Sequence, residues 1–133
     1  MPEAGWLTIP AGTWAIDDPL VLPTGYGLRL GPGTTLRFGP EAFVLASGPL
    51  DFAGTAEAPV VMQPQMDAWR GVLVLEADAP SSWQHVTIED TDAVLLGGWT
   101  VTGAVTFYRS PVRISYGRFL GTRAEDALNI IRT

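Results

Sequence analysis

The chain has 133 residues, of which 47% are hydrophobic and 17% charged, and this composition excludes an intrinsically disordered protein. The net charge is −6 and every basic residue is an arginine; without a basic stripe to neutralise phosphates, this balance argues against a nucleic-acid partner. The lack of cysteine excludes disulfides, thiolate catalysis and cysteine-based metal sites, and no apolar run approaches the roughly 20 residues of a membrane span.

Three short apolar segments open the chain, at residues 7–9, 14–16 and 20–22. Prolines and glycines separate them, and breakers at such close spacing favour turns over long strands. We therefore expect residues 1–27 to form an irregular opening turn that covers the first edge of the following strands.

Four apolar triplets then recur at a constant spacing of 22 residues, beginning at Leu28, Leu50, Val72 and Val94. In the first two triplets a charged residue separates two apolar ones, which is the alternation of a strand with one buried face. A constant offset predicts that the chain returns to the same lateral position once per turn. The four residues are therefore expected to stack in one column.

A second strand is expected after each triplet, at residues 36–38, 60–62, 86–88 and 105–107. The turns between the two strands vary in length, as surface loops can. The predicted fold class is all-β, a right-handed parallel β-helix (β-solenoid) of about five or six coils. It forms a single domain over residues 1–133.

Two more strands are expected at residues 112–116 and 128–130, and the sequence stops within the second without a polar cap. A bare last coil would expose unpaired backbone groups and apolar side chains. This predicts the N-terminal part of a longer solenoid, or an end that lies against a partner. The first residues lack the pattern of a signal peptide, and a secreted or cell-envelope location is favoured because a longer exported chain would supply one.

Residues 31–38, Gly-Pro-Gly-Thr-Thr-Leu-Arg-Phe, and residues 48–61 resemble the opening coils of bacterial right-handed parallel β-helix proteins of the pectin-lyase-like superfamily. The run Trp-Arg-Gly-Val at residues 69–72 fits the same pattern, in which a Trp-x-Gly opens a strand. The resemblance implies a β-helix. It implies no single activity, because that superfamily holds lyases, glycosidases, epimerases and adhesins.

Residues 103–108, 110–112 and 125–130 carry a more specific likeness. They are similar to β-helix segments of bacterial proteins that carry or accompany spore-coat-type (CotH-like) kinase domains. Together with the earlier runs, the resemblance spans most of residues 28–131.

Acidic residues directly follow the strand expected at residues 86–88, namely Glu89, Asp90 and Asp92. Carboxylates at a strand end could share a Ca²⁺ ion, although Ca²⁺ takes six to eight oxygen ligands and at most three are local here. The alternative is a turn in which Asp and Thr side chains bond to nearby backbone groups.

A second charged cluster contains Arg123, Glu125 and Asp126. If the strands stack, it could join the first cluster on one face and bind a cation or the hydroxyl groups of a sugar. The alternative is a set of exposed ion pairs that contribute little to stability.

Three of the five tryptophans, Trp69, Trp83 and Trp99, lie beside expected turns. If these turns align, the indoles form a ridge on which sugar rings could stack. The alternative is that each packs at a corner of the core, a position that suits large aromatic side chains.

No residue cluster dictates a reaction, so no catalytic residue, metal site or cofactor other than Ca²⁺ is assigned. The sequence favours a non-catalytic β-helix scaffold or a glycan-binding surface of a bacterial extracellular or envelope protein. One alternative is a truncated polysaccharide lyase or glycoside hydrolase. Another is a structural module that stacks end to end with partner coils. The expected partners are polysaccharide or further β-helix coils.

Overall fold

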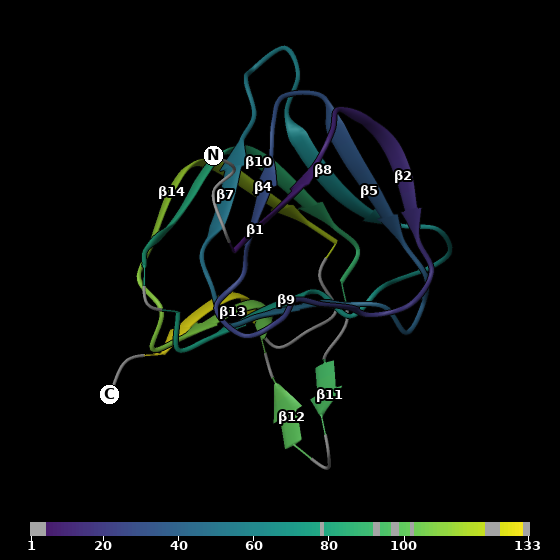
Figure 1. Cartoon of the computed structure of the whole chain (residues 1–133). Coiled ribbons are helices and arrows are strands. Elements are labelled where there is room, and N and C mark those ends of the chain that lie inside the picture. The colour runs from purple at the N-terminus through teal and green to yellow at the C-terminus, as the bar shows by residue number, and fades with distance from the viewer. Residues whose placement is uncertain are drawn as a thin grey trace.

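The computed structural model describes residues 5–77, 79–91, 94–96, 99–101, 103–121 and 126–131. For the strand residues between 94 and 104, and for residues 126, 127, 129 and 131, it describes the backbone alone. Every element in this part of the chain is a β-strand, and the strands form two parallel sheets and one hairpin (Figure 1). The all-β prediction is confirmed.

The larger sheet has eight strands in the order β1-β4-β7-β10-β8-β5-β2, with β14 also paired to β10. The first half of β10 pairs with β7 and its second half with β8, so β10 joins two legs of one sheet. The sheet therefore curls into a half-barrel (Figure 1). Its strands are β1 (Trp6–Ile9), β2 (Gly12–Ile16), β4 (Gly27–Leu30), β5 (Thr34–Phe38), β7 (Leu50–Ala53), β8 (Val60–Pro64), β10 (Ser81–Glu89) and β14 (Val112–Leu120).

We call β1, β4, β7 and the first halves of β10 and β14 the first leg, and β2, β5, β8 and the second halves of β10 and β14 the second leg. A five-stranded sheet, in the order β15-β13-β9-β6-β3, lies across the open side of the half-barrel (Figure 1). Its strands are β3 (Leu20–Val21), β6 (Val44–Ala46), β9 (Val72–Leu75), β13 (Gly103–Tyr108) and β15 (Asp126–Ile131).

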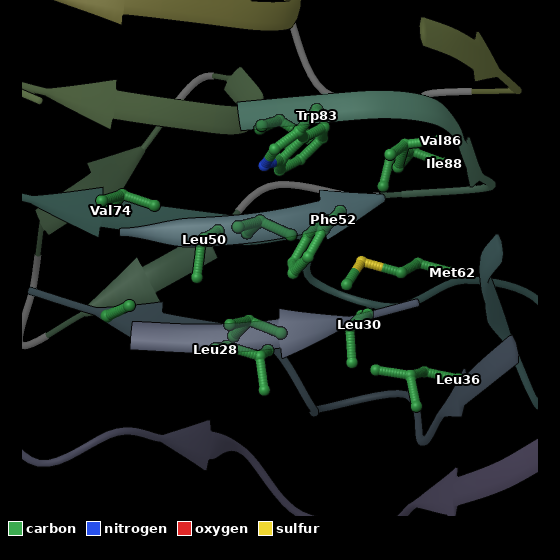
Figure 2. Packing of buried hydrophobic residues seen from close by; sticks show 14 of the residues in the cluster. Leu28, Leu30, Leu36, Leu50, Phe52, Met62, Val74, Trp83, Val86 and Ile88 are labelled. Carbon is green, nitrogen blue, oxygen red and sulfur yellow. The ribbon is translucent and has the colours of Figure 1, made fainter. Parts of the chain in front are cut away.

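The core lies between the two sheets and follows from the alternation of side chains along each strand. Leu28 and Leu30 of β4 point inward with 0% exposure and pair with Leu50 and Phe52 of β7, which are equally buried. Figure 2 shows these side chains in adjacent layers, with Trp83 of β10 next to Phe52. The Phe52 and Trp83 rings lie 4.9 Å apart, so aromatic contacts continue the aliphatic column.

Residues with left-handed backbone conformations mark corners of the fold. His85 (φ 50°) lies within β10 where the two legs meet, and Tyr116 (φ 58°) lies beside it in β14. Their rings stack at 4.5 Å with an interplanar angle of 5°. Non-glycine residues seldom adopt this conformation because it is unfavourable. It persists here because the strand pairing on both sides of the bend enforces it.

We expected the first residues of the four triplets to stack in one column. This prediction is confirmed for Leu28 and Leu50 and is wrong for Val72 and Val94. Leu28 pairs with Leu50, but Val72 belongs to the other sheet, where it pairs with Val44 of β6. Val94 begins β11 (Val94–Leu96), which pairs antiparallel with β12 (Trp99–Val101) in a separate hairpin. A β-helix of five or six coils with a constant repeat is therefore not what the structure shows. The parallel strands instead form a half-barrel and a second sheet, because loops of unequal length separate them.

The opening segment is more regular than expected. The strand β1 pairs with β4, β2 with β5 and β3 with β6, all in parallel. Prolines lie between these strands and not within them, since Pro10 and Pro19 fall in the connections. The first strands therefore continue both sheets in register.

Gly54 and Gly31 offer a matched test of close backbone packing. A Cβ atom at Gly54 would lie 2.7 Å from the Val60 nitrogen and 3.0 Å from the Pro59 Cα, whereas one at Gly31 would meet nothing within 4 Å. We expect Gly54→Ala to lower the free energy of unfolding by about 1–3 kcal/mol. Gly31→Ala is expected to leave it unchanged or to raise it by up to about 1 kcal/mol. Urea unfolding followed by tryptophan fluorescence measures both, and equal stabilities would contradict the close approach at Gly54.

Candidate functional site

The outer face of the first leg carries a row of polar side chains in register. Thr8 pairs with Arg29, Arg29 with Asp51, Asp51 with Ser82, and Ser82 with Arg113. We call these five residues the polar ladder. Strands in a sheet lie about 4.8 Å apart, so the ladder is roughly 19 Å long.

The ladder follows from the same alternation that builds the core. Arg29 separates the buried Leu28 and Leu30, and Asp51 separates the buried Leu50 and Phe52, so both charged side chains must face outward. Thr8, Ser82 and Arg113 are exposed, while Arg29 and Asp51 are partly exposed.

The centre of the ladder is held in place by two contacts. The Arg29 Nε lies 3.4 Å from an Asp51 carboxylate oxygen, and the Arg29 guanidinium lies 4.2 Å from the ring centroid of Trp6. The pair is more than one third exposed, so solvent screens it and its contribution to stability is small. Its consequence is positional, because the contacts hold a donor, an acceptor and an aromatic ring together on the outer face of the first leg.

The ladder offers hydrogen-bond donors, acceptors and hydroxyl groups that can do both. Arginine supplies donors only, ionised aspartate supplies acceptors only, and the two hydroxyl residues supply both. A row of this composition suits a partner whose groups both donate and accept along its length. It has no arrangement of nucleophile and base that would indicate a reaction.

The structure describes the side chains of only two of the acidic residues singled out from the sequence. Glu89 ends β10 and is partly buried, and Asp90 is exposed with a φ of 52°. The Asp90 backbone nitrogen donates to the Leu120 oxygen at 2.8 Å, and its own oxygen accepts from the Trp69 nitrogen at 3.2 Å. Asp90 therefore occupies a turn that joins neighbouring strands.

The rest of the predicted charged site lies outside the described side chains, namely Asp92, Arg123, Glu125 and Asp126. Within the side chains that are described, no group of three or more His, Cys, Asp or Glu residues is placed to hold a metal ion. The Ca²⁺ hypothesis consequently gains no support from Glu89 and Asp90, which supply too few oxygen ligands.

Two of the three tryptophans proposed for sugar stacking are core residues. Trp69 and Trp83 are both 0% exposed. The Trp69 ring stacks on Phe38 at 4.1 Å, and Trp83 packs between Phe52 and Phe107. Neither indole presents a face at the surface, because inward positions of the strands bury both. The side chain of Trp99 lies outside the described part of the structure.

A shallow depression of about 340 Å³ lies beside Arg70, whose guanidinium pairs with Glu41 at 3.0 Å. Pro40, Met66, Asp67 and Ala68 complete its lining. It holds no buried polar group that would orient a ligand, and it does not adjoin the polar ladder. We therefore place the candidate site on the sheet face and not in this depression.

Sequence reasoning singled out neither the ladder nor its length. The signal was present in part, because Arg29 and Asp51 are the charged residues that separate apolar pairs in the first two triplets. Ser82 and Arg113 join them only through the pairing of β7, β10 and β14, which no constant offset predicts.

No protein-family model, curated protein sequence or solved structure matches the chain. The resemblance to pectin-lyase-like β-helix proteins, and to those associated with spore-coat-type kinase domains, is wrong, because the parallel strands form a half-barrel and a second sheet and not a β-helix. Short runs such as Gly-Pro-Gly-Thr-Thr carried it, and these are turn and strand signals that any parallel sheet protein can share. Among the described residues there is also no helix of the length and apolar character that a membrane crossing needs.

Proposed function

We propose that this chain is a non-catalytic scaffold whose polar ladder binds an extended, hydroxyl-rich polymer, with a polysaccharide as the expected class. The observation that carries the proposal is the register of Thr8, Arg29, Asp51, Ser82 and Arg113 across five parallel strands. Sheet strands held by backbone hydrogen bonds form a rigid face, so little conformational entropy is lost when a polymer lies along it.

The chemistry of the ladder supports a glycan over a polyanion or a peptide. Arg29 and Asp51 neutralise each other, and the chain as a whole carries a net charge of −6, which disfavours phosphate-rich polymers. A peptide would bind more strongly at an unpaired sheet edge than on a face whose strands are already paired with each other.

The proposal predicts that two arginines of the ladder contribute to polysaccharide affinity and that a third arginine, outside the ladder, does not. Arg29→Ala and Arg113→Ala are each expected to weaken binding to a polysaccharide about tenfold, because a hydrogen bond to a charged group contributes about 1.5–3 kcal/mol. Arg37→Ala is the matched control, since Arg37 is exposed on the second leg and lies outside the ladder. Affinity electrophoresis in gels that contain soluble polysaccharides measures all three.

The same polymers serve to test for turnover. Binding without release of reducing ends or unsaturated products is the expected result. Release of such products, and its loss in Asp90→Asn, would instead favour a lyase or hydrolase. Equal binding by Arg113→Ala and Arg37→Ala would contradict the assignment of the site to the first leg.

A further inference from the structure

The two ends of the sheets are open within the described residues. At one end, which we call the N-edge, β1, β2 and β3 each pair with one neighbour only. At the other, which we call the C-edge, β14 pairs with β10 and β15 with β13. Strands of this kind present unpaired N–H and C=O groups, which are a template for another strand.

The core columns also end without a cover at the N-edge. Leu7 pairs with the buried Leu28 and Trp14 with the buried Leu36, so both occupy inward positions of the strands. Leu7 is nevertheless 38% exposed and Trp14 42% exposed. Large apolar side chains that face along the column into solvent mark a surface for association.

The C-edge ends in the same way. Ile130 lies beside the buried Phe107 and is 49% exposed, and Ile114 lies beside Trp83 and is only partly buried. Tyr116 stacks one ring face on His85 and is 75% exposed. Both ends of the described sheets thus carry apolar residues that are exposed or only partly buried.

Charge distinguishes the two ends and selects how they meet. Residues 5–22, which build the N-edge, contain Asp17 and Asp18 and no basic residue. The strand β14 of the C-edge contains Arg113 and Arg118 and no acidic residue. All four are exposed, and Asp17 accepts a hydrogen bond from Gln65 at 2.9 Å. The other C-edge strand, β15, adds only Asp126, so the C-edge strands keep a net positive charge. Opposite charges favour an N-edge against a C-edge, whereas two like edges would repel.

We propose that the C-edge of one copy of this chain binds the N-edge of a second copy, so that β14 and β15 pair with strands of the next molecule. Because every pairing within the two sheets is parallel, this head-to-tail contact continues both sheets with the same polarity. A contact between two different surfaces does not close on itself and gives open chains of molecules. The proposal does not rest on polymer binding by the ladder, and Arg113 is the residue that belongs to both surfaces.

Two blocked variants of the full chain test the polarity. Leu7→Arg places a charge at the N-edge and Ile130→Glu places one at the C-edge. In sedimentation velocity between about 1 µM and 1 mM, the unmodified protein is expected to form species that grow with concentration. Each variant alone should form dimers at most weakly, with association reduced at least tenfold. An equimolar mixture in which one copy retains a free C-edge and the other a free N-edge should form a one-to-one dimer and nothing larger.

A milder variant keeps the test valid if a blocked variant does not fold. Arg118→Glu changes an exposed residue and replaces an attraction to the acidic N-edge with a repulsion. It should weaken association about tenfold at low salt, and added salt should then narrow the difference from the unmodified protein. Circular dichroism establishes that each variant retains its strands. A monomer at all concentrations would overturn the proposal and point to another occupant of the edges. Self-dimers of a blocked variant as strong as those of the unmodified protein would overturn it in favour of contacts between like edges.

Discussion

Replacing Trp83 by alanine is expected to lower the free energy of unfolding by about 3–5 kcal/mol, a large part of the stability of a domain this size. Trp83 is fully buried in the first half of β10, the strand that joins the two legs. Its ring lies 4.9 Å from that of Phe52 and 5.6 Å from that of Phe107, so it links the half-barrel to the five-stranded sheet. The neighbouring strands are fixed by backbone pairing and cannot collapse into the cavity.

Trp14→Ala is the matched control, because it removes the same side chain from the edge of the same sheet. Trp14 is 42% exposed, and its indole nitrogen donates to the Pro10 oxygen at 2.8 Å. Its loss should cost about 1–2 kcal/mol, since part of its surface remains in water. Urea unfolding at a concentration too low for association measures both. A loss below about 1 kcal/mol for Trp83→Ala would show that the two sheets do not share one core.

The burial pattern of individual strands could be predicted from the sequence, but their assignment to sheets could not. Leu28, Arg29 and Leu30 alternate as expected between the core and the outer face. In β9, by contrast, Val72, Leu73 and Val74 are all buried, because Phe43, Leu45 and Leu75 pack against the outward side of Leu73. An apolar run without alternation is compatible with any sheet that is covered on both faces.

The antiparallel hairpin could also have been predicted from the sequence. Two apolar runs at residues 94–96 and 99–101 flank the dipeptide Gly97-Gly98, which is a strong hairpin signal. The 22-residue offset favoured a parallel strand at Val94 instead, and that prediction is wrong. The local turn signal was the better guide, because only one step of the repeat, from Leu28 to Leu50, is confirmed.

The candidate site was harder to predict because it depends on register. Ser82 and Arg113 belong to the polar ladder only because β10 pairs with both β7 and β14. Loops of different length precede these strands, and loop length carries little information about register. The tryptophans were misleading for a related reason, since proximity to a turn says nothing about which side of a strand faces the core.

The second large effect concerns hydrogen bonding by the two buried indoles. Trp69 donates from Nε1 to the Glu89 oxygen at 2.7 Å, whereas Trp83 Nε1 has no hydrogen-bond partner among the described residues. Trp69→Phe and Trp83→Phe remove the same atoms from equally buried positions. We expect Trp69→Phe to cost about 2–4 kcal/mol and Trp83→Phe about 1–2 kcal/mol.

The two variants are expected to differ because one leaves a buried hydrogen-bond acceptor unpaired, whereas the other removes a buried donor that was already unpaired among the described residues. Phenylalanine at position 69 leaves the Glu89 oxygen without its donor, while phenylalanine at position 83 removes a donor whose loss of hydration was never compensated. Both free energies come from urea unfolding, with Phe38→Leu as a control for the loss of stacking on Trp69 alone. Equal losses for the two Trp→Phe variants would mean that the Trp69–Glu89 bond contributes nothing net.

The hydrogen bond between Trp69 and Glu89 can also be tested by its effect on nearby backbone amides. Its backbone nitrogen donates to the Asp90 oxygen at 3.2 Å, and Trp69 forms an isolated bridge with Thr91. The indole bond and this bridge therefore tie the segment before β9 to the end of β10. Trp69→Phe should speed hydrogen exchange of the backbone amide at position 69, whereas Trp83→Phe should leave it unchanged. Unchanged exchange in both variants would place the stabilising effect of Trp69 in its stacking on Phe38 and not in its hydrogen bond.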